Sequence, residues 1–137
     1  MVEKFKLLLE QIEQMNGPVI LYVVSRMDNF VDSWSVIISA DWVSADKEIQ
    51  KSQFREILNL LVKVFTEDAV NIARVGLFTK TDYVTKQFSQ FKSGTVLKED
   101  RVNGYDIHEA HIIKSVDIDQ TDTTDANENG DQMKLPT

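Results

Sequence analysis

Cysteine is absent from the 137-residue chain. Its absence excludes disulfides, thiolate nucleophiles and cysteine-based zinc sites, and a reducing compartment is the simplest fit. Glycine is scarce: the five glycines stand far apart, at positions 17, 76, 94, 104 and 130. The chain therefore has neither a Walker-type phosphate loop nor a dinucleotide fingerprint, because both need closely spaced glycines.

Long apolar runs are also missing. The longest one, Val19 to Val24, is far shorter than the roughly 20 residues that a membrane helix needs. Charges interrupt the first residues of the chain, unlike those of a secretory signal. We therefore expect a cytoplasmic protein that does not bind membranes.

Acidic residues exceed basic ones, and the formal net charge is −7. Much of this excess lies in residues 116–137, which have almost no core-forming side chains and cannot offset the entropy cost of ordering. We expect a single α+β domain over residues 1–115 and a disordered acidic tail over 116–137. An acidic protein repels phosphate backbones, so general nucleic-acid binding is disfavoured.

Three segments have the spacing of amphipathic helices, in which apolar residues recur every three or four positions. They are residues 2–15, residues 47–66, and a shorter segment that starts at Thr81 or Asp82 and stops at Ser93-Gly94. In the longest of these helices, Ser44 or Asp46 can cap the first turn. Its expected buried stripe is Phe54, Ile57, Leu58, Leu61 and Phe65.

Five further segments have strand patterns, and the clearest alternation runs from Trp34 to Trp42. The turn Asn103-Gly104 favours a hairpin near the end of the domain. The element order αββαβαββ predicts an α+β fold: a mixed, largely antiparallel five-stranded sheet with three helices packed mainly on one face. The strands are expected at 19–26, 34–42, 70–79, 95–101 and 105–114.

Both histidines lie on the last expected strand. Asp106 and His108 are two positions apart and share a face, so they could act as a base and its orienting partner in catalysis. The alternative is a pair of surface histidines without any chemistry.

No metal or cofactor site is predicted. His108 and His111 are three positions apart on a strand, so they point to opposite faces and cannot easily share an ion. In the tail, residues 125–131 match the first half of a calcium loop, but Pro136 stands where a glutamate ligand belongs. A polar tail without bound ions is the simpler interpretation.

Polar residues on the less apolar face of the sheet form a second candidate site. Arg74 lies among apolar neighbours in its strand, where an arginine needs an acceptor, and Asp41 is one candidate. Arg74 could then clamp an anionic ligand. The alternative is an ordinary solvated face, because alternation alone predicts exposed polar residues. The residues expected to converge are Ser35, Ser39, Asp41, Arg74 and His108.

A basic segment extends from Arg74 to Arg101, with aromatic residues between the bases. This composition is typical of a nucleic-acid footprint, in which Lys80, Lys86 and Lys92 would contact phosphates. Lysines also solvate ordinary surfaces, and the phenylalanines of this segment fall on an expected helix stripe. Nucleic-acid binding is therefore the less favoured hypothesis.

Phe30 and Val31 occupy the expected tip of the first hairpin. Apolar residues at such a tip can anchor a partner protein, or they can fold back onto a neighbouring helix. Because no complete catalytic set is present, we expect a non-enzymatic protein-binding or regulatory module whose partner is another protein or a second copy of the chain. The alternative is a small enzyme or ligand-binding protein that uses the polar sheet face.

Overall fold

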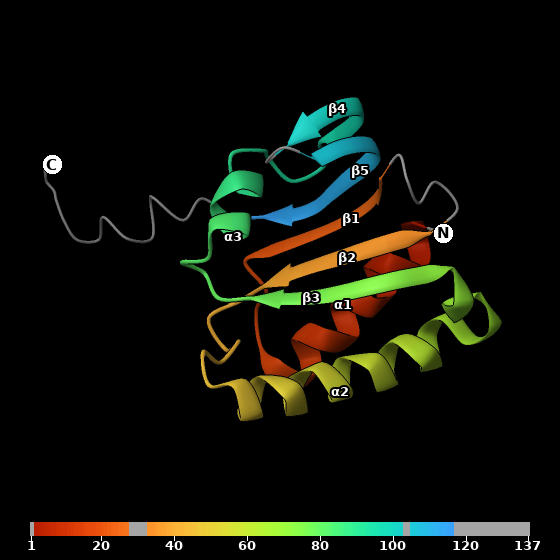
Figure 1. Ribbon diagram of the computed structural model, residues 1–137. Helices are drawn as coiled ribbons and strands as arrows, with labels where there is room; N and C mark the ends of the chain where they lie inside the picture. Colours follow the sequence, from red (N-terminus) through yellow and green to blue (C-terminus); the bar gives the residue numbers. More distant parts are fainter. Residues whose placement is uncertain (1, 28–32, 103–104, 117–137) are drawn as a thin grey trace, which may run out of the picture.

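The computed structural model describes residues 2–27, 33–102 and 105–116 (Figure 1). The helices are α1 (Val2–Asn16), α2 (Lys47–Phe65) and α3 (Tyr83–Phe88), with a 3-10 helix, η2 (Thr66–Asn71), after α2. The strands are β1 (Leu21–Met27), β2 (Trp34–Ser39), β3 (Ile72–Phe78), β4 (Val96–Val102) and β5 (Tyr105–Ser115). Apart from η2, this order confirms the predicted α+β fold. The expectations for Phe30, Val31, the turn 103–104 and the tail beyond residue 116 lie outside the described residues.

The five strands form one mixed sheet in the order β3-β2-β1-β5-β4. Three of the four strand pairs are antiparallel, and only β2 and β3 run parallel, joined through α2. This arrangement confirms the largely antiparallel sheet. It also places β3 at one edge and β4 at the other, which the sequence alone did not determine (Figure 1).

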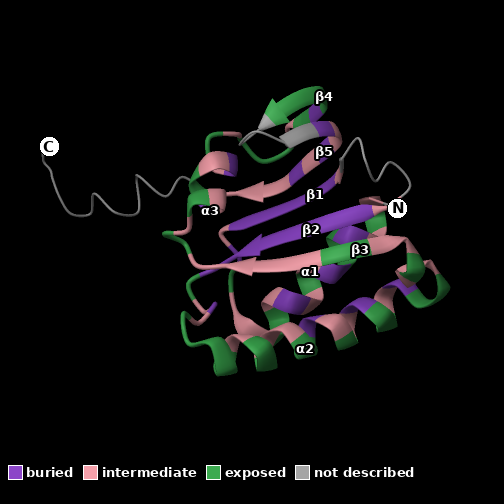
Figure 2. Ribbon diagram, viewed as in Figure 1, coloured by how far each residue is buried: buried purple, intermediate pink, exposed green. Residues whose placement is uncertain are grey.

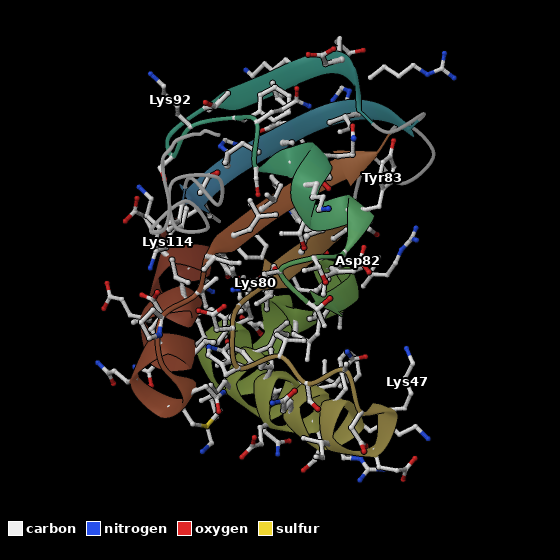
Figure 3. All side chains as sticks on the ribbon, turned by 90° about the vertical axis from the view of Figure 1, so that its left-hand side faces the viewer. Lys47, Lys80, Asp82, Tyr83, Lys92 and Lys114 are labelled. Carbon is white, nitrogen blue, oxygen red and sulfur yellow. The ribbon has the colours of Figure 1, made fainter. Side chains whose placement is uncertain are left out.

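The two faces of the sheet are covered unequally. Helices α1 and α2 pack on one face, which we call the α1/α2 face, and α3 packs on the other, the α3 face (Figures 1 and 3). The core of the α1/α2 face includes Phe5, Leu8, Ile12, Tyr22, Val24, Trp34, Val36, Ile38, Ile57, Leu61 and Phe65. The core of the α3 face is smaller and consists of Leu21, Val23, Ile37, Phe88, Leu97, Ile107, Ala110 and Ile112.

Aromatic residues join α1 to the sheet and to α2. The ring of Phe5 lies 5.4 Å from that of Trp34 and 4.8 Å from that of Phe65, measured between centroids. The Tyr22 hydroxyl donates a 2.8 Å hydrogen bond to the Phe5 carbonyl, and burial raises the pKa of this phenol above its ordinary value. Trp42 is half-buried, and its indole N–H donates to the Gly17 carbonyl at 3.1 Å. Neither tryptophan is therefore freely solvated.

Helix α2 begins as the sequence predicts, but its apolar stripe is only partly covered. The Asp46 carboxylate accepts hydrogen bonds from the backbone N–H groups of Glu48 and Ile49 and caps the first turn. Of the five stripe residues, Ile57, Leu61 and Phe65 are buried, whereas Phe54 and Leu58 are half-buried. Phe54 and Leu58 stay partly exposed because α2 runs beside β3, at the border of the sheet. No strand lies beyond β3 among the described residues (Figure 1).

The α3 face differs from the solvated surface that alternation alone predicts. Ser25, Ser35 and Ser39 are buried there, on the face where Phe78 and Phe88 pack. Two elements are also shorter than expected, since β2 ends at Ser39 and α3 ends at Phe88. In the described ranges, no helix is long and apolar enough to cross a membrane.

Candidate functional site

The two edges of the sheet differ in their protection against pairing with another chain. Strand β4 has four successive charged residues, 98–101, and Glu99 adopts a positive φ of 50° where the ladder is irregular. Charges and bulges of this kind prevent an edge strand from accepting a further strand. Strand β3 has one charged residue, Arg74, and pairs regularly with β2 from Arg74 to Phe78. The β3 edge is therefore the one suited to strand addition.

Strand β3 is also the least buried of the strands on its side of the sheet. Figure 2 shows β1 and β2 mostly buried, whereas β3 is intermediate to exposed along its whole length. Its single irregularity lies near Ala73, where the register with β2 shifts. Among the described strands, none pairs with its outer edge. The outward amide and carbonyl groups of β3 thus have no partner strand in the part of the chain that the structure describes.

A groove runs along β3 between this strand and α2, and we call it the α2 groove. It comprises two adjoining hollows of about 390 and 290 Å³, which share Phe54 and Val75 in their walls. The first hollow extends to Val62 of α2 and Ile72 of β3. The second extends to Leu77 at the other end of β3. The groove thus follows nearly the whole strand, and its walls are mainly apolar.

Large apolar side chains are exposed at one end of the α2 groove. Val62, in the groove wall, is 57% exposed. Val70 follows the wall residue Ala69 and is 85% exposed, the highest value among the large apolar side chains of the described residues. Val62 and Val70 thus leave apolar surface exposed near the start of β3.

A separate pocket of about 170 Å³ lies on the α3 face, and we call it the α3 pocket. Ser35 of β2 and Arg74 of β3 are register partners, and both line this pocket. Its remaining walls are mostly apolar. The side chains that form them come from the sheet and from α3: Ile37, Phe78, Val84, Phe88 and Ile107.

The structure brings together only part of the predicted polar site. Ser35 and Arg74 meet at the α3 pocket, but neither Asp41 nor His108 lines it among the described residues. Asp41 lies 3.4 Å from the Lys80 ammonium in an exposed ion pair. His108 pairs with Glu99 of β4, at 2.6 Å between Nδ1 and the carboxylate. The side chain of Asp106, the proposed partner of His108, lies outside the described residues.

A charged cluster on the α1/α2 face was not predicted from the sequence. The Glu109 carboxylate accepts a hydrogen bond from the guanidinium of Arg26 and lies 2.5 Å from Nε2 of His111. Trp34 lies beneath both partners, with its ring 5.0 Å from the Arg26 guanidinium carbon and 6.0 Å from the imidazole. Antiparallel pairing of β1 with β5 creates this cluster, because Arg26 is opposite Glu109 and Val24 is opposite His111.

We expect the cluster to make the protein sensitive to acid. The hydrogen bond with His111, and then the contacts with Arg26, hold the pKa of Glu109 below its usual range, and burial opposes them. A depressed pKa in the folded state means that the ionised carboxylate stabilises the fold above its ordinary pKa and that this stabilisation is lost as the pH falls. In chemical unfolding titrations between about pH 5 and pH 3, Glu109→Gln should lose less stability than the parent protein.

Glu48→Gln is the matched control for that comparison, because the Glu48 side chain is 84% exposed. Glu48→Gln keeps the cluster around Glu109, so the loss of stability that this cluster causes on acidification should persist. The pKa of Glu13 is also lowered, so Glu13 makes the stability of every variant depend partly on pH. Equal slopes for the parent protein and Glu109→Gln would contradict the role given to Glu109.

The three lysines of the nucleic-acid hypothesis are all exposed. Lys80 and Lys92 lie well apart (Figure 3), and Lys80 is next to the Asp41 carboxylate. They line neither the α2 groove nor the α3 pocket. Binding of a nucleic acid through them stays a prediction from the sequence.

In the part of the chain that the structure describes, no group of three histidine or acidic residues could hold a metal ion. No protein-family model matches the chain, and no curated protein or solved structure shows significant similarity to it.

Proposed function

We propose that the protein is a non-enzymatic protein-binding module that accepts an extended segment of its partner along the β3 edge. The observation that supports this most strongly is the α2 groove beside an unprotected strand edge. In strand addition, main-chain hydrogen bonds give affinity, and pockets for alternate side chains give specificity. Strand β3 offers main-chain hydrogen-bonding groups, and the α2 groove offers pockets for side chains.

The partner that fits this surface is a second copy of the chain. Two β3 strands paired antiparallel about Val75 place Arg74 of each copy opposite Gly76 of the other. This register avoids placing like charges opposite each other, which is destabilising. The exposed Val62 and Val70 of both copies would then lose contact with water.

A lysine in the α2 groove tests this proposal. Val62→Lys adds a charge that must lose water when the groove is covered, so self-association should weaken about tenfold or more. Sedimentation equilibrium over a wide range of protein concentrations measures the association constant. Two controls should associate like the parent protein: Leu7→Lys, on the exposed side of α1, and Val96→Lys, on the opposite sheet edge.

The sedimentation results either support or overturn self-association through β3. A parent protein that dimerises and a Val62→Lys variant that does not, with both controls unchanged, support the proposal. A parent protein that stays monomeric at every concentration overturns self-association through β3. Equal association of all four proteins places the interface elsewhere and overturns it as well.

A further inference from the structure

The α3 pocket has the size and lining of a site for one small ring. Its volume is about 170 Å³, and a cavity of roughly 150 Å³ lined by aliphatic and aromatic side chains holds one benzene molecule. Phe78, Phe88 and Ile37 form much of its wall. A planar apolar group would therefore contact apolar side chains from both the sheet and α3.

Two polar residues with side-chain donors line the α3 pocket. Arg74 and Ser35 lie side by side there, as register partners of β3 and β2. Arg74 has an interaction of its own, and the five N–H donors of a guanidinium allow it to bind a further acceptor. Carboxylates match the fork of an arginine better than any neutral acceptor does.

Ser25 supplies a buried hydroxyl group in β1, the strand next to β2. Ser25 lies directly opposite Ser35 in the β1–β2 ladder, and its side chain is fully buried. Its Oγ has no hydrogen-bond partner among the described residues. Buried polar groups are normally satisfied, and Ser25 does not itself line the α3 pocket, so a water molecule beside Ser35 is the simplest partner for this hydroxyl group.

Gly76 shapes the floor of the α3 pocket. A Cβ atom at this position would lie 2.7 Å from Cε2 and 3.0 Å from Cζ of Phe78. The missing side chain therefore lets the Phe78 ring fold back over its own strand. The Phe78 ring therefore forms part of the pocket wall and does not fill the pocket.

We infer that the α3 pocket binds a small aromatic carboxylate, with its ring against Phe78 and Phe88 and its carboxylate at Arg74 and Ser35. The pocket lies on the α3 face and the α2 groove lies between β3 and α2, and Arg74 and Val75 border both. The inference does not need self-association, because all of the pocket walls named above belong to one chain.

Benzoate is the probe for this site. Titrated into the isotope-labelled full chain, it should shift the backbone amide resonances of Ser35, Gly76 and Val84. Benzyl alcohol keeps the ring but lacks the charge, and acetate keeps the charge but lacks the ring. We expect benzyl alcohol to bind about tenfold more weakly than benzoate, and acetate to cause no saturable shift.

Two variants locate the bound molecule. Val84→Phe fills the pocket from α3 and should abolish the benzoate shifts, whereas Tyr83→Phe, at an exposed neighbour outside the pocket wall, should leave them unchanged. Arg74→Gln should weaken benzoate binding about tenfold without altering the weaker binding of benzyl alcohol. Because Arg74→Gln leaves the apolar wall intact, it provides the test if Val84→Phe fails to fold.

Three results would overturn the inference. The first is the absence of saturable amide shifts with benzoate in the parent protein. The second is equal binding of benzoate and benzyl alcohol, which would remove the role of the carboxylate. The third is unchanged benzoate binding by a folded Val84→Phe variant, which would place the molecule outside this pocket.

Discussion

Phe5→Ala is expected to lower the free energy of unfolding by about 3–5 kcal/mol, the usual range for deleting a buried aromatic ring. Phe5 is fully buried and contacts the rings of Trp34 and Phe65, so its removal leaves a cavity where α1, α2 and the sheet meet. Natural domains are stable by only about 5–15 kcal/mol. A loss of this size would bring the protein close to unfolding at ordinary temperature, and denaturant titration measures it.

Leu7→Ala is the control for the Phe5 variant, because Leu7 lies on the same helix and is 44% exposed. It should change stability by less than about 1 kcal/mol, as substitutions away from the core do. Similar losses in the two variants would show that α1 does not pack as described.

Trp34→Ala is the second large effect, with an expected loss of about 3–5 kcal/mol. Trp34 contacts Phe5 on one side and Arg26 and His111 on the other, so it joins the core to the charged cluster. Trp34→Phe keeps an aromatic ring in this position and should cost clearly less. Equal losses in the alanine and phenylalanine variants would contradict the packing role of the ring.

The two alanine variants should not be additive. Phe5 and Trp34 contact each other, and residues in contact show coupling energies of about 0.5–3 kcal/mol. The double variant should therefore lose less stability than the two single losses added together, because the shared contact is removed only once.

The sequence predicted the fold wherever local patterns decide structure. Alternation in β2 correctly placed Trp34, Val36 and Ile38 on one buried face. The short side chains of Asp46 and Asp82 cap α2 and α3 where the pattern predicts, because capping depends only on neighbouring amides.

The α2 groove could not be predicted in this way, because it depends on strand order. Helical spacing placed Phe54 and Leu58 on the buried stripe of α2 together with Ile57. Their partial exposure follows only from the position of β3 at the edge of the sheet. The apolar Val62 and Val70, which do not belong to the expected stripe, were the available signal in the sequence.

Strand order also decided which polar residues meet. Parallel pairing of β2 with β3 put Ser35 beside Arg74, as the polar-face hypothesis required. Asp41 follows the end of β2 and forms an ion pair with Lys80. His108, on β5, pairs with Glu99 of β4. Spacing along a chain gives the face of each strand, but neighbours across a sheet depend on pairing.

Amide hydrogen exchange of the full chain, measured at low and at high protein concentration, tests the β3 interface most directly. Self-association through β3 predicts that the outward-facing amides among residues 72–78, which do not face β2, exchange more slowly at high concentration, because a second strand protects them. Amides of β4, at the charged edge, should exchange at the same rate under both conditions. Concentration-independent exchange of residues 72–78, or protection of β4 instead, would contradict the account.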